Sequence, residues 1–164
     1  MIIIPQEANV LVVAGDSPDL ENDMLELHGA YNVCACNRAS RRLCFLPDYW
    51  AVWHVDWIPR LREGGCPEPI EATISQFEAP GVRQVRVEVS GGSVTLYAVL
   101  AGLKMGFKKI ITAGVCLNFG EYTRHRRGWI KKFNAEPDFG RKVRGLSGFP
   151  AELLRRPDEA WLKN

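Results

Sequence analysis

The fold class is decided by one stretch of the sequence, NVLVVAGDSPDL at residues 9–20. After Asn9 it runs through five apolar residues, mostly β-branched, a pattern typical of a central parallel strand that helices cover on both faces. The strand is expected to stop at Gly15. Ser17 then suits the N-cap of a helix and Pro18 suits its first turn. The stretch therefore predicts a strand, a tight turn and a helix, which together form the repeating unit of α/β folds.

The same unit recurs along the chain. Further strands are expected at residues 31–36, 49–55, 71–77, 83–89 and 110–113. An almost wholly apolar stretch at residues 94–105 predicts a helix that is buried on more than one side. Beyond residue 120 the pattern weakens: residues 124–133 are basic around Trp129, and residues 151–162 resemble a terminal helix broken by Pro157. Because these elements alternate over short connections, we expect a three-layer Rossmann-like α/β fold, with a mostly parallel sheet flanked by helices.

Length and composition are those of one globular domain. The 164 residues are 46% hydrophobic and 24% charged, so we expect a single domain over residues 1–164. No apolar run approaches the roughly 20 residues that cross a bilayer, and residues 1–10 lack a basic leader. A cytoplasmic protein without a membrane span is expected. The five cysteines lack metal-ligand spacing, which favours free thiols and no metal site.

Charge is distributed unevenly. Residues 121–164, a basic C-terminal extension, hold 11 basic and 6 acidic residues, a net charge of +5, which leaves −3 for the first 120 residues. Such an extension suits a ligand that bears phosphate, although a merely solvated surface explains it equally well. No nucleic-acid-binding motif accompanies it, so we expect no nucleic-acid partner.

Ligands of parallel α/β sheets bind beyond the carboxyl ends of the strands. Two glycine-containing bends at such positions, residues 15–17 and 91–93, lead straight into expected helices. Their amides offer a site for a phosphate or carboxylate, or they are simply turns. The motifs of nicotinamide-dinucleotide proteins and of P-loop proteins are missing, and so is the nucleophile elbow of serine hydrolases. Those three classes are therefore excluded.

The order of the motifs carries a resemblance. It comprises VLVVAGDSPDL, NVCACN, PDYWAVWHVD and SGGSVTLYAVLAGLKMGFKKIITAGVCLNF. In this order the chain resembles the 6-hydroxymethylpterin diphosphokinase-like (MptE-like) family over residues 9–120. It is also similar to the small Rossmann-like sialyltransferases of bacteria, which hold a cytidine nucleotide sugar.

The resemblance implies a nucleotide-dependent transferase that moves a glycosyl or a diphosphate group, with a nucleotide or nucleotide sugar as its partner. The implied nucleotide-binding residues are Gly15, Asp16, Ser17, Asn37, Gly91, Gly92 and Ser93. Diphosphate transfer would need Mg²⁺, for which Asp16 and Asp56 are the available ligands. A non-catalytic nucleotide-binding accessory protein is the alternative, because Cys116 stands where the family has an acid. A homo-oligomer stays open.

His125 is the candidate acid/base group, and Asp56 is the second implied catalytic residue, near the ribose. His125 lies in a basic loop and is alternatively a solvent-exposed histidine. The arginines around it, Arg124, Arg126 and Arg127, are expected to hold the phosphate of the donor. His54 and the tryptophans Trp50, Trp53 and Trp57 are expected to pack in the core, although one tryptophan suits stacking on a base.

Overall fold

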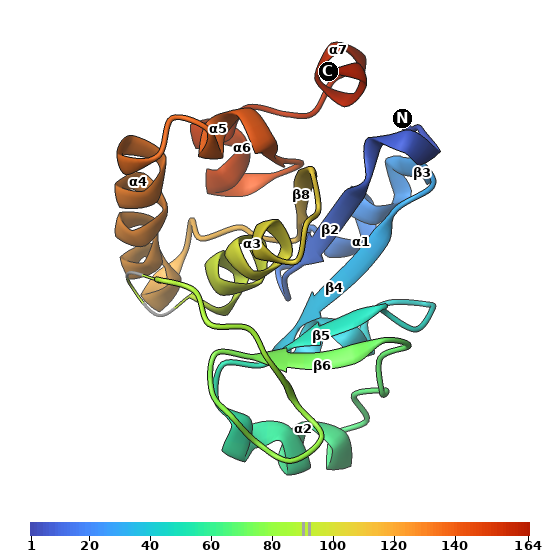
Figure 1. Cartoon of the computed structure of the whole chain (residues 1–164), viewed down its shortest axis with the longest axis vertical. Helices are drawn as coiled ribbons and strands as arrows, with labels where there is room; N and C mark the ends of the chain where they lie inside the picture. Colours follow the sequence, from blue (N-terminus) through green and yellow to red (C-terminus); the bar gives the residue numbers. More distant parts are fainter. Residues whose placement is uncertain (90, 92) are drawn as a thin grey trace.

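A computed structural model describes residues 1–89, 91 and 93–164 and confirms a three-layer α/β fold (Figure 1). Within the described residues, seven strands form one sheet in the order β7-β6-β5-β4-β2-β8-β9, with every pairing parallel. In chain order the strands are β2 (Val10–Ala14), β4 (Asn32–Cys36), β5 (Tyr49–Ala51), β6 (Ala72–Ser75), β7 (Arg83–Gln84), β8 (Lys109–Ala113) and β9 (Val143–Gly145). The strand order reverses direction between β2 and β8, which is where ligands bind in such sheets.

Helices cover both faces of the sheet. One face packs against α1 (Leu20–Leu25), α2 (Ile58–Glu63) and α7 (Glu159–Lys163). The other packs against α3 (Val94–Lys104), α4 (Arg126–Ala135), α5 (Phe139–Lys142) and α6 (Gly148–Leu154), and α3 lies on the near side in Figure 1. None of the helices among the described residues is long and apolar enough to cross a bilayer.

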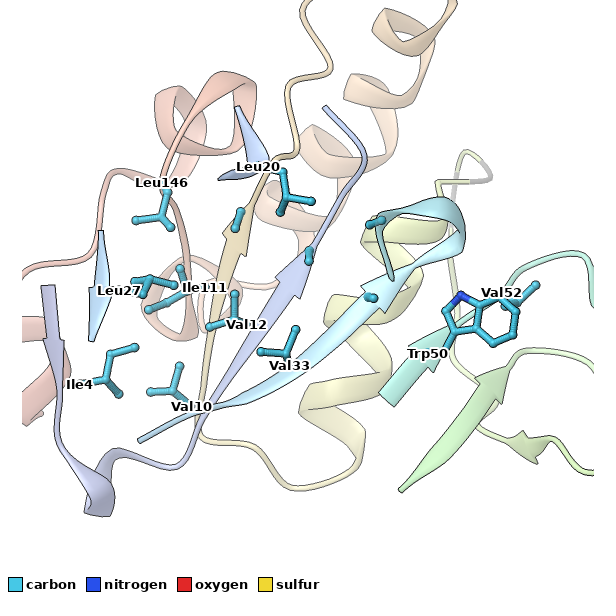
Figure 2. Packing of buried hydrophobic residues seen from close by; sticks show 14 of the residues in the cluster. Ile4, Val10, Val12, Leu20, Leu27, Val33, Trp50, Val52, Ile111 and Leu146 are labelled. Atoms are coloured by element: carbon cyan, nitrogen blue, oxygen red, sulfur yellow. The ribbon is translucent and has the colours of Figure 1, made fainter. Parts of the chain in front are cut away.

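The position of β2 between the two hydrophobic clusters explains why its sequence is apolar throughout. All five of its residues are buried, and they alternate between the two hydrophobic clusters. Val12 lies opposite Val33 of β4 and Ile111 of β8, and Figure 2 shows these three side chains together. The prediction of a central strand covered on both faces is therefore confirmed.

The α3 helix also matches its prediction. It extends over Val94–Lys104, and its residues 96–102 are all buried. Its N-cap is Ser93, whose Oγ accepts a hydrogen bond of 3.3 Å from the amide of Leu96. Gly102 brings the helix against Leu11 and Ile110, where a Cβ atom would collide with both side chains.

Other local predictions are wrong. The first helix begins at Leu20 rather than at Pro18, and its N-cap is Asp19 rather than Ser17, whose side chain makes no capping bond. Gly29, expected to end that helix, instead closes a short strand, β3 (Leu27–Gly29), which pairs in parallel with β1 (Ile2–Ile4) in a small second sheet. At Gly29 φ is +104°, and a side chain would collide with the carbonyl of Ile4.

Several predicted elements are shorter or divided. β5 ends at Ala51 instead of residue 55, and β7 has two residues instead of seven, although Val85 still points into the core. The helix expected at 151–162 is two helices, α6 and α7, with Pro157 between them. Helix α2 and strand β9 were not predicted, because each has too few residues for a clear periodicity.

The five cysteines are free thiols, as expected. Three of them, Cys34, Cys36 and Cys66, are buried. Burial raises the pKa of Cys34 to about 12, so this thiol stays protonated and behaves as a small apolar side chain.

Candidate functional site

A cavity of about 860 Å³ lies at the carboxyl end of the sheet. Its lining comes from the segments that follow β2, β4, β5 and β8, from the start of α3, and from the 3-10 helices η2 (Asn37–Arg41), η3 (Val55–Trp57) and η4 (Gly120–His125). Cavities that bind small ligands typically measure about 300–1,000 Å³. The cavity therefore lies in the region where the strand-end rule places a ligand site.

Most of the expected site residues meet in this cavity. Those that line it are Gly15, Asp16, Ser17, Asn37, Ser93, Arg124 and His125. Those whose side chains or backbone do not line it are Asp56, Gly91, Arg126 and Arg127. The expectation for Gly92 falls outside the described residues. The two glycine-containing bends thus contribute to one cavity, through residues 15–17 and Ser93.

Two amides of the first bend have partners within the protein, which favours the alternative that this bend is simply a turn. The amide of Gly15 donates to the carbonyl of Ala113 at 2.8 Å, and the amide of Ser17 donates to the carbonyl of Gly114 at 3.0 Å. At Gly15 a Cβ atom would lie 2.9 Å from Cγ2 of Val115 and would also collide with the carbonyl of Gly114. Glycine is therefore required here because the ends of β2 and β8 approach closely.

Two polar side-chain atoms of the cavity lining are buried and have no hydrogen-bond partner among the described residues. They are Oγ of Ser17 and Oδ1 of Asn37. Asn37 also adopts a left-handed backbone, with φ at +48°, and its carbonyl accepts a hydrogen bond of 2.8 Å from Nε1 of Trp50. Buried polar atoms are nearly always paired, and strained residues concentrate at functional sites. Both atoms are therefore candidates to bind a ligand.

His125 is held beside the start of α3. Its Nδ1 lies 2.6 Å from the carbonyl oxygen of Gly91. Because a carbonyl can only accept, Nδ1 carries the hydrogen, and Nε2 of the neutral ring is left with a lone pair. Gly91 is exposed, has φ at +90°, and lies against Gly128 of α4. The bond therefore holds the ring beside Gly91, two residues before the N-cap of α3, in the tautomer that a general base needs.

The three arginines expected to bind phosphate are placed differently. Nη2 of Arg124 lies 3.7 Å from the carboxylate of Glu121. Arg126 donates from Nε to the carbonyl of Leu117 at 2.8 Å and from Nη2 to Oδ1 of Asn118 at 2.5 Å, and its guanidinium lies 4.8 Å from the ring centre of Phe149. Arg126 therefore supports the loop after β8 and is not directed at a ligand. Arg127 is exposed outside the lining.

Three arginines that sequence reasoning missed do line the cavity. Arg38 and Arg41 belong to η2, and Arg60 belongs to α2. A signal was present, since the run NRASRR at residues 37–42 directly follows the second predicted strand. This run was overlooked because residues 121–164 hold a larger excess of basic residues.

Aromatic side chains form part of the cavity rim. Trp57, Tyr122 and Phe119 line it and are 44%, 59% and 76% exposed. His54 also lines it and is exposed, with its ring 4.6 Å from that of Trp57 and tilted by 30°. The expectation that His54 and Trp57 pack in the core is wrong, because the chain turns out of the sheet after β5. Trp50 is buried, and Trp53 packs against Phe77 and Tyr97, as expected.

The carboxylates do not gather as a cation site requires. Among the described residues, no three His, Cys, Asp or Glu side chains form a group that could hold a metal ion. Asp16 is paired with Arg42 at 3.2 Å, and Asp56 lies outside the cavity lining. These two residues therefore do not fit the Mg²⁺ site that diphosphate transfer would need.

A buried carboxylate that was not predicted, Asp23, connects the segments next to the cavity. Oδ2 of Asp23, on α1, accepts hydrogen bonds from the amide of Gly114 at 2.7 Å and from Oγ of Ser147 at 2.6 Å. Burial raises the pKa of this carboxyl group, and the two hydrogen bonds oppose part of that rise because they stabilise the charged form. Asp23 therefore joins α1, the loop after β8 and the start of α6.

Comparisons with known proteins point to one fold. No protein-family model matches the chain, and no curated protein matches it. The chain shares its fold with solved structures of the sialyltransferase CstII from Campylobacter jejuni. The complex with CMP-3FNeuAc has a TM-score of 0.61 at 12% identity, and the complex with cytidine-5'-monophosphate has a TM-score of 0.57 at 12% identity. Each match covers 91% of this chain and 88% of that chain. At this identity the likeness shows the fold alone: this chain shares the α/β fold of CstII.

Proposed function

We propose that this protein is a glycosyltransferase that uses a nucleotide sugar, with a cytidine nucleotide sugar as the donor. The observation that carries the proposal is His125, fixed by its bond to Gly91 beside the N-terminus of α3 and lining the cavity. The shared fold supports it, because CstII binds cytidine-5'-monophosphate and CMP-3FNeuAc.

The chemistry follows from that juxtaposition. Nε2 of His125 takes the proton from an acceptor hydroxyl while the hydroxyl oxygen attacks the anomeric carbon of the donor sugar. The bond from that carbon to the phosphate oxygen breaks, and the nucleotide leaves with the electron pair. The N-terminus of α3 stabilises the negative charge on the leaving phosphate through its dipole and its amides. Proton transfer and charge stabilisation thus come from residues that lie close together.

Donor binding would use the two unpaired atoms of the lining. Oγ of Ser17 and Oδ1 of Asn37 are both buried. Oδ1 is an acceptor, which matches the exocyclic amino group of cytosine or a ribose hydroxyl. The exposed ring of Trp57 offers a surface for stacking. Filling these positions removes the free-energy cost of leaving buried polar groups unpaired.

The test begins with donor binding. Purified protein is titrated with CMP, CMP-N-acetylneuraminic acid, UDP-glucose and ATP, and the melting temperature and the heat of binding are measured. A cytidine compound at 100 times its Kd should stabilise the fold by about 2.7 kcal/mol, whereas the other nucleotides should shift it less. Failure of every cytidine compound to bind would refute the proposal.

Turnover is then measured as CMP release in the presence of sugar acceptors. His125→Ala should lower kcat by about 10²–10⁴-fold and leave donor affinity unchanged, because the residue acts as a base. His28→Ala is the matched control, since His28 is exposed on β3 outside the cavity. The wild type could instead bind cytidine compounds without any turnover, with neither substitution changing that affinity. This result would identify the nucleotide-binding accessory protein, the alternative that the sequence left open.

A further inference from the structure

The uncompensated positive charge of the cavity lies on one wall. Arg38, Arg41 and Arg60 line it, and no ion pair involves any of them within the described part of the chain. The two carboxylates of the lining are already paired, Asp16 with Arg42 and Glu121 with Arg124. We call Arg38, Arg41 and Arg60 the arginine wall.

This wall and His125 lie on opposite sides of the sheet. Helix α2, which carries Arg60, packs through Ile58 and Leu61 into the cluster on the α1 face. His125 directly precedes α4, which packs through Trp129 into the cluster on the α3 face. Figure 1 shows α2 at the bottom of the view and α4 at its left side, apart from each other. The cavity therefore straddles the carboxyl edge of the sheet, with the reacting side at one end and the arginine wall at the other.

The leaving phosphate of the donor does not account for the arginine wall. That phosphate is bonded to the anomeric carbon, which must be reached by the hydroxyl that His125 deprotonates. It therefore lies beside the N-terminus of α3. The nucleoside part of a cytidine donor carries no further charge. A carboxylate on the donor sugar, as in CMP-N-acetylneuraminic acid, is bonded to the same anomeric carbon and therefore lies on the α3 side as well. The arginines on the α2 side are thus left for an anionic group of the acceptor.

Guanidinium groups suit such a group well. Arginine binds carboxylates and phosphates with two parallel hydrogen bonds, and these charge-assisted bonds are about twice as strong as neutral ones. The exposed ring of Trp57, with the His54 ring against it, lies on the same wall and offers an apolar face to a sugar ring. Arginines beside an exposed aromatic ring match an acidic sugar or a sugar phosphate.

We propose that Arg38, Arg41 and Arg60 bind a carboxylate or phosphate group on the acceptor, so that the protein transfers its glycosyl group to acidic acceptors. The proposal rests on the proposed glycosyltransferase function and deepens it by naming the class of acceptor. The arginine wall is a specificity-determining surface, because it touches the acceptor away from the reacting atoms.

Three acceptors of the same disaccharide test the proposal: the neutral sugar, its uronic acid and its phosphate monoester. The wild-type kcat/KM should be at least 10-fold higher for one of the acidic forms than for the neutral form, and the two acidic arms identify which anion is preferred. In Arg38→Gln/Arg60→Gln this preference should fall to within about twofold, with KM for the donor unchanged. Raising the salt concentration should weaken the preference of the wild type.

The matched control is Arg83→Gln/Arg86→Gln, which removes the same charge from exposed arginines on and beside β7, outside the cavity. It should keep the preference. A wild type that uses the neutral acceptor equally well overturns the proposal. So does a rise in donor KM with equal effects on all acceptors, which would assign the arginines to the donor.

Calorimetry separates this proposal from the glycosyltransferase function itself. The acidic disaccharide alone should bind the wild type and lose at least 10-fold in affinity in the arginine variant. Binding of this kind without any turnover would uphold the subsite while refuting the transferase. Equal affinity of the wild type for the neutral and acidic sugars would refute the subsite whether or not turnover occurs.

Discussion

Asp23 is the residue whose removal tests the support of the cavity. In Asp23→Ala the amide of Gly114 and the hydroxyl of Ser147 lose their common acceptor, Oδ2, at bonds of 2.7 and 2.6 Å. Leaving the buried amide of Gly114 unpaired costs about 1–3 kcal/mol, whereas the hydroxyl of Ser147 can rotate toward water and adds little. The free energy of unfolding should therefore fall by about 1–3 kcal/mol. Asp23→Asn keeps an oxygen acceptor of the same shape and should lose less than about 1 kcal/mol.

Urea denaturation at pH 7 measures both losses. A loss in Asp23→Asn as large as that in Asp23→Ala would mean that the charge of Asp23, and not its role as acceptor, stabilises the fold. That result would refute the reasoning.

The pH dependence of the same variants has a defined sign. Burial raises the pKa of Asp23 above its ordinary value of 3.8, so the folded state binds this proton more tightly than the unfolded state does. The resulting stability is fully present below pH 3.8 and is lost as the pH rises through the raised pKa. The difference in unfolding free energy, wild type minus Asp23→Asn, should therefore fall with rising pH across that window and then level off. A difference that rises with pH would contradict the assignment.

Two further variants test the neighbouring segments. Gly15→Ala places a methyl group 2.9 Å from Val115 and against the carbonyl of Gly114, so urea denaturation should show a loss of about 1–3 kcal/mol; an unchanged midpoint would show that β2 and β8 can separate at no cost. Arg126→Ala removes the hydrogen bonds to Leu117 and Asn118, so amide hydrogen exchange at residues 115–119 should accelerate and KM for the donor should rise. The control Lys131→Ala changes an exposed position on the same helix and should alter neither quantity. Unchanged slow exchange in Arg126→Ala would exclude a supporting role for Arg126.

The central elements could be predicted because their own residues determine them. The run in β2 is apolar at every position, and only burial on both faces satisfies such a strand. The same holds for residues 96–102 of α3. The pairing of β1 with β3 could not be predicted, because three-residue strands carry no periodicity and their partners are set by packing.

The position of the candidate cavity followed from topology, but the contacts of its charged residues did not. Parallel strands bring their carboxyl ends to one edge, which explains why residues 15–17 and Asn37 line one cavity. His125 lies beyond any strand end and was expected only from the resemblance to sialyltransferases. Which arginine faces that cavity depends on partners distant in sequence. Arg126 is engaged by Leu117, Asn118 and Phe149, and a basic run alone does not reveal such contacts.

The distinction between scaffold and site rests on which polar groups the protein itself satisfies. The amide of Gly15, the carboxylate of Asp16 and the guanidinium of Arg126 all have partners within the chain. Oγ of Ser17 and Oδ1 of Asn37 have none among the described residues, although burying them unpaired costs free energy. A fold retains such a cost where a ligand removes it, and the fixed ring of His125 lies in the same cavity. Because both atoms are buried, a substrate reaches them only when the side chains of Ser17 and Asn37 rotate toward the cavity that the satisfied groups hold in shape.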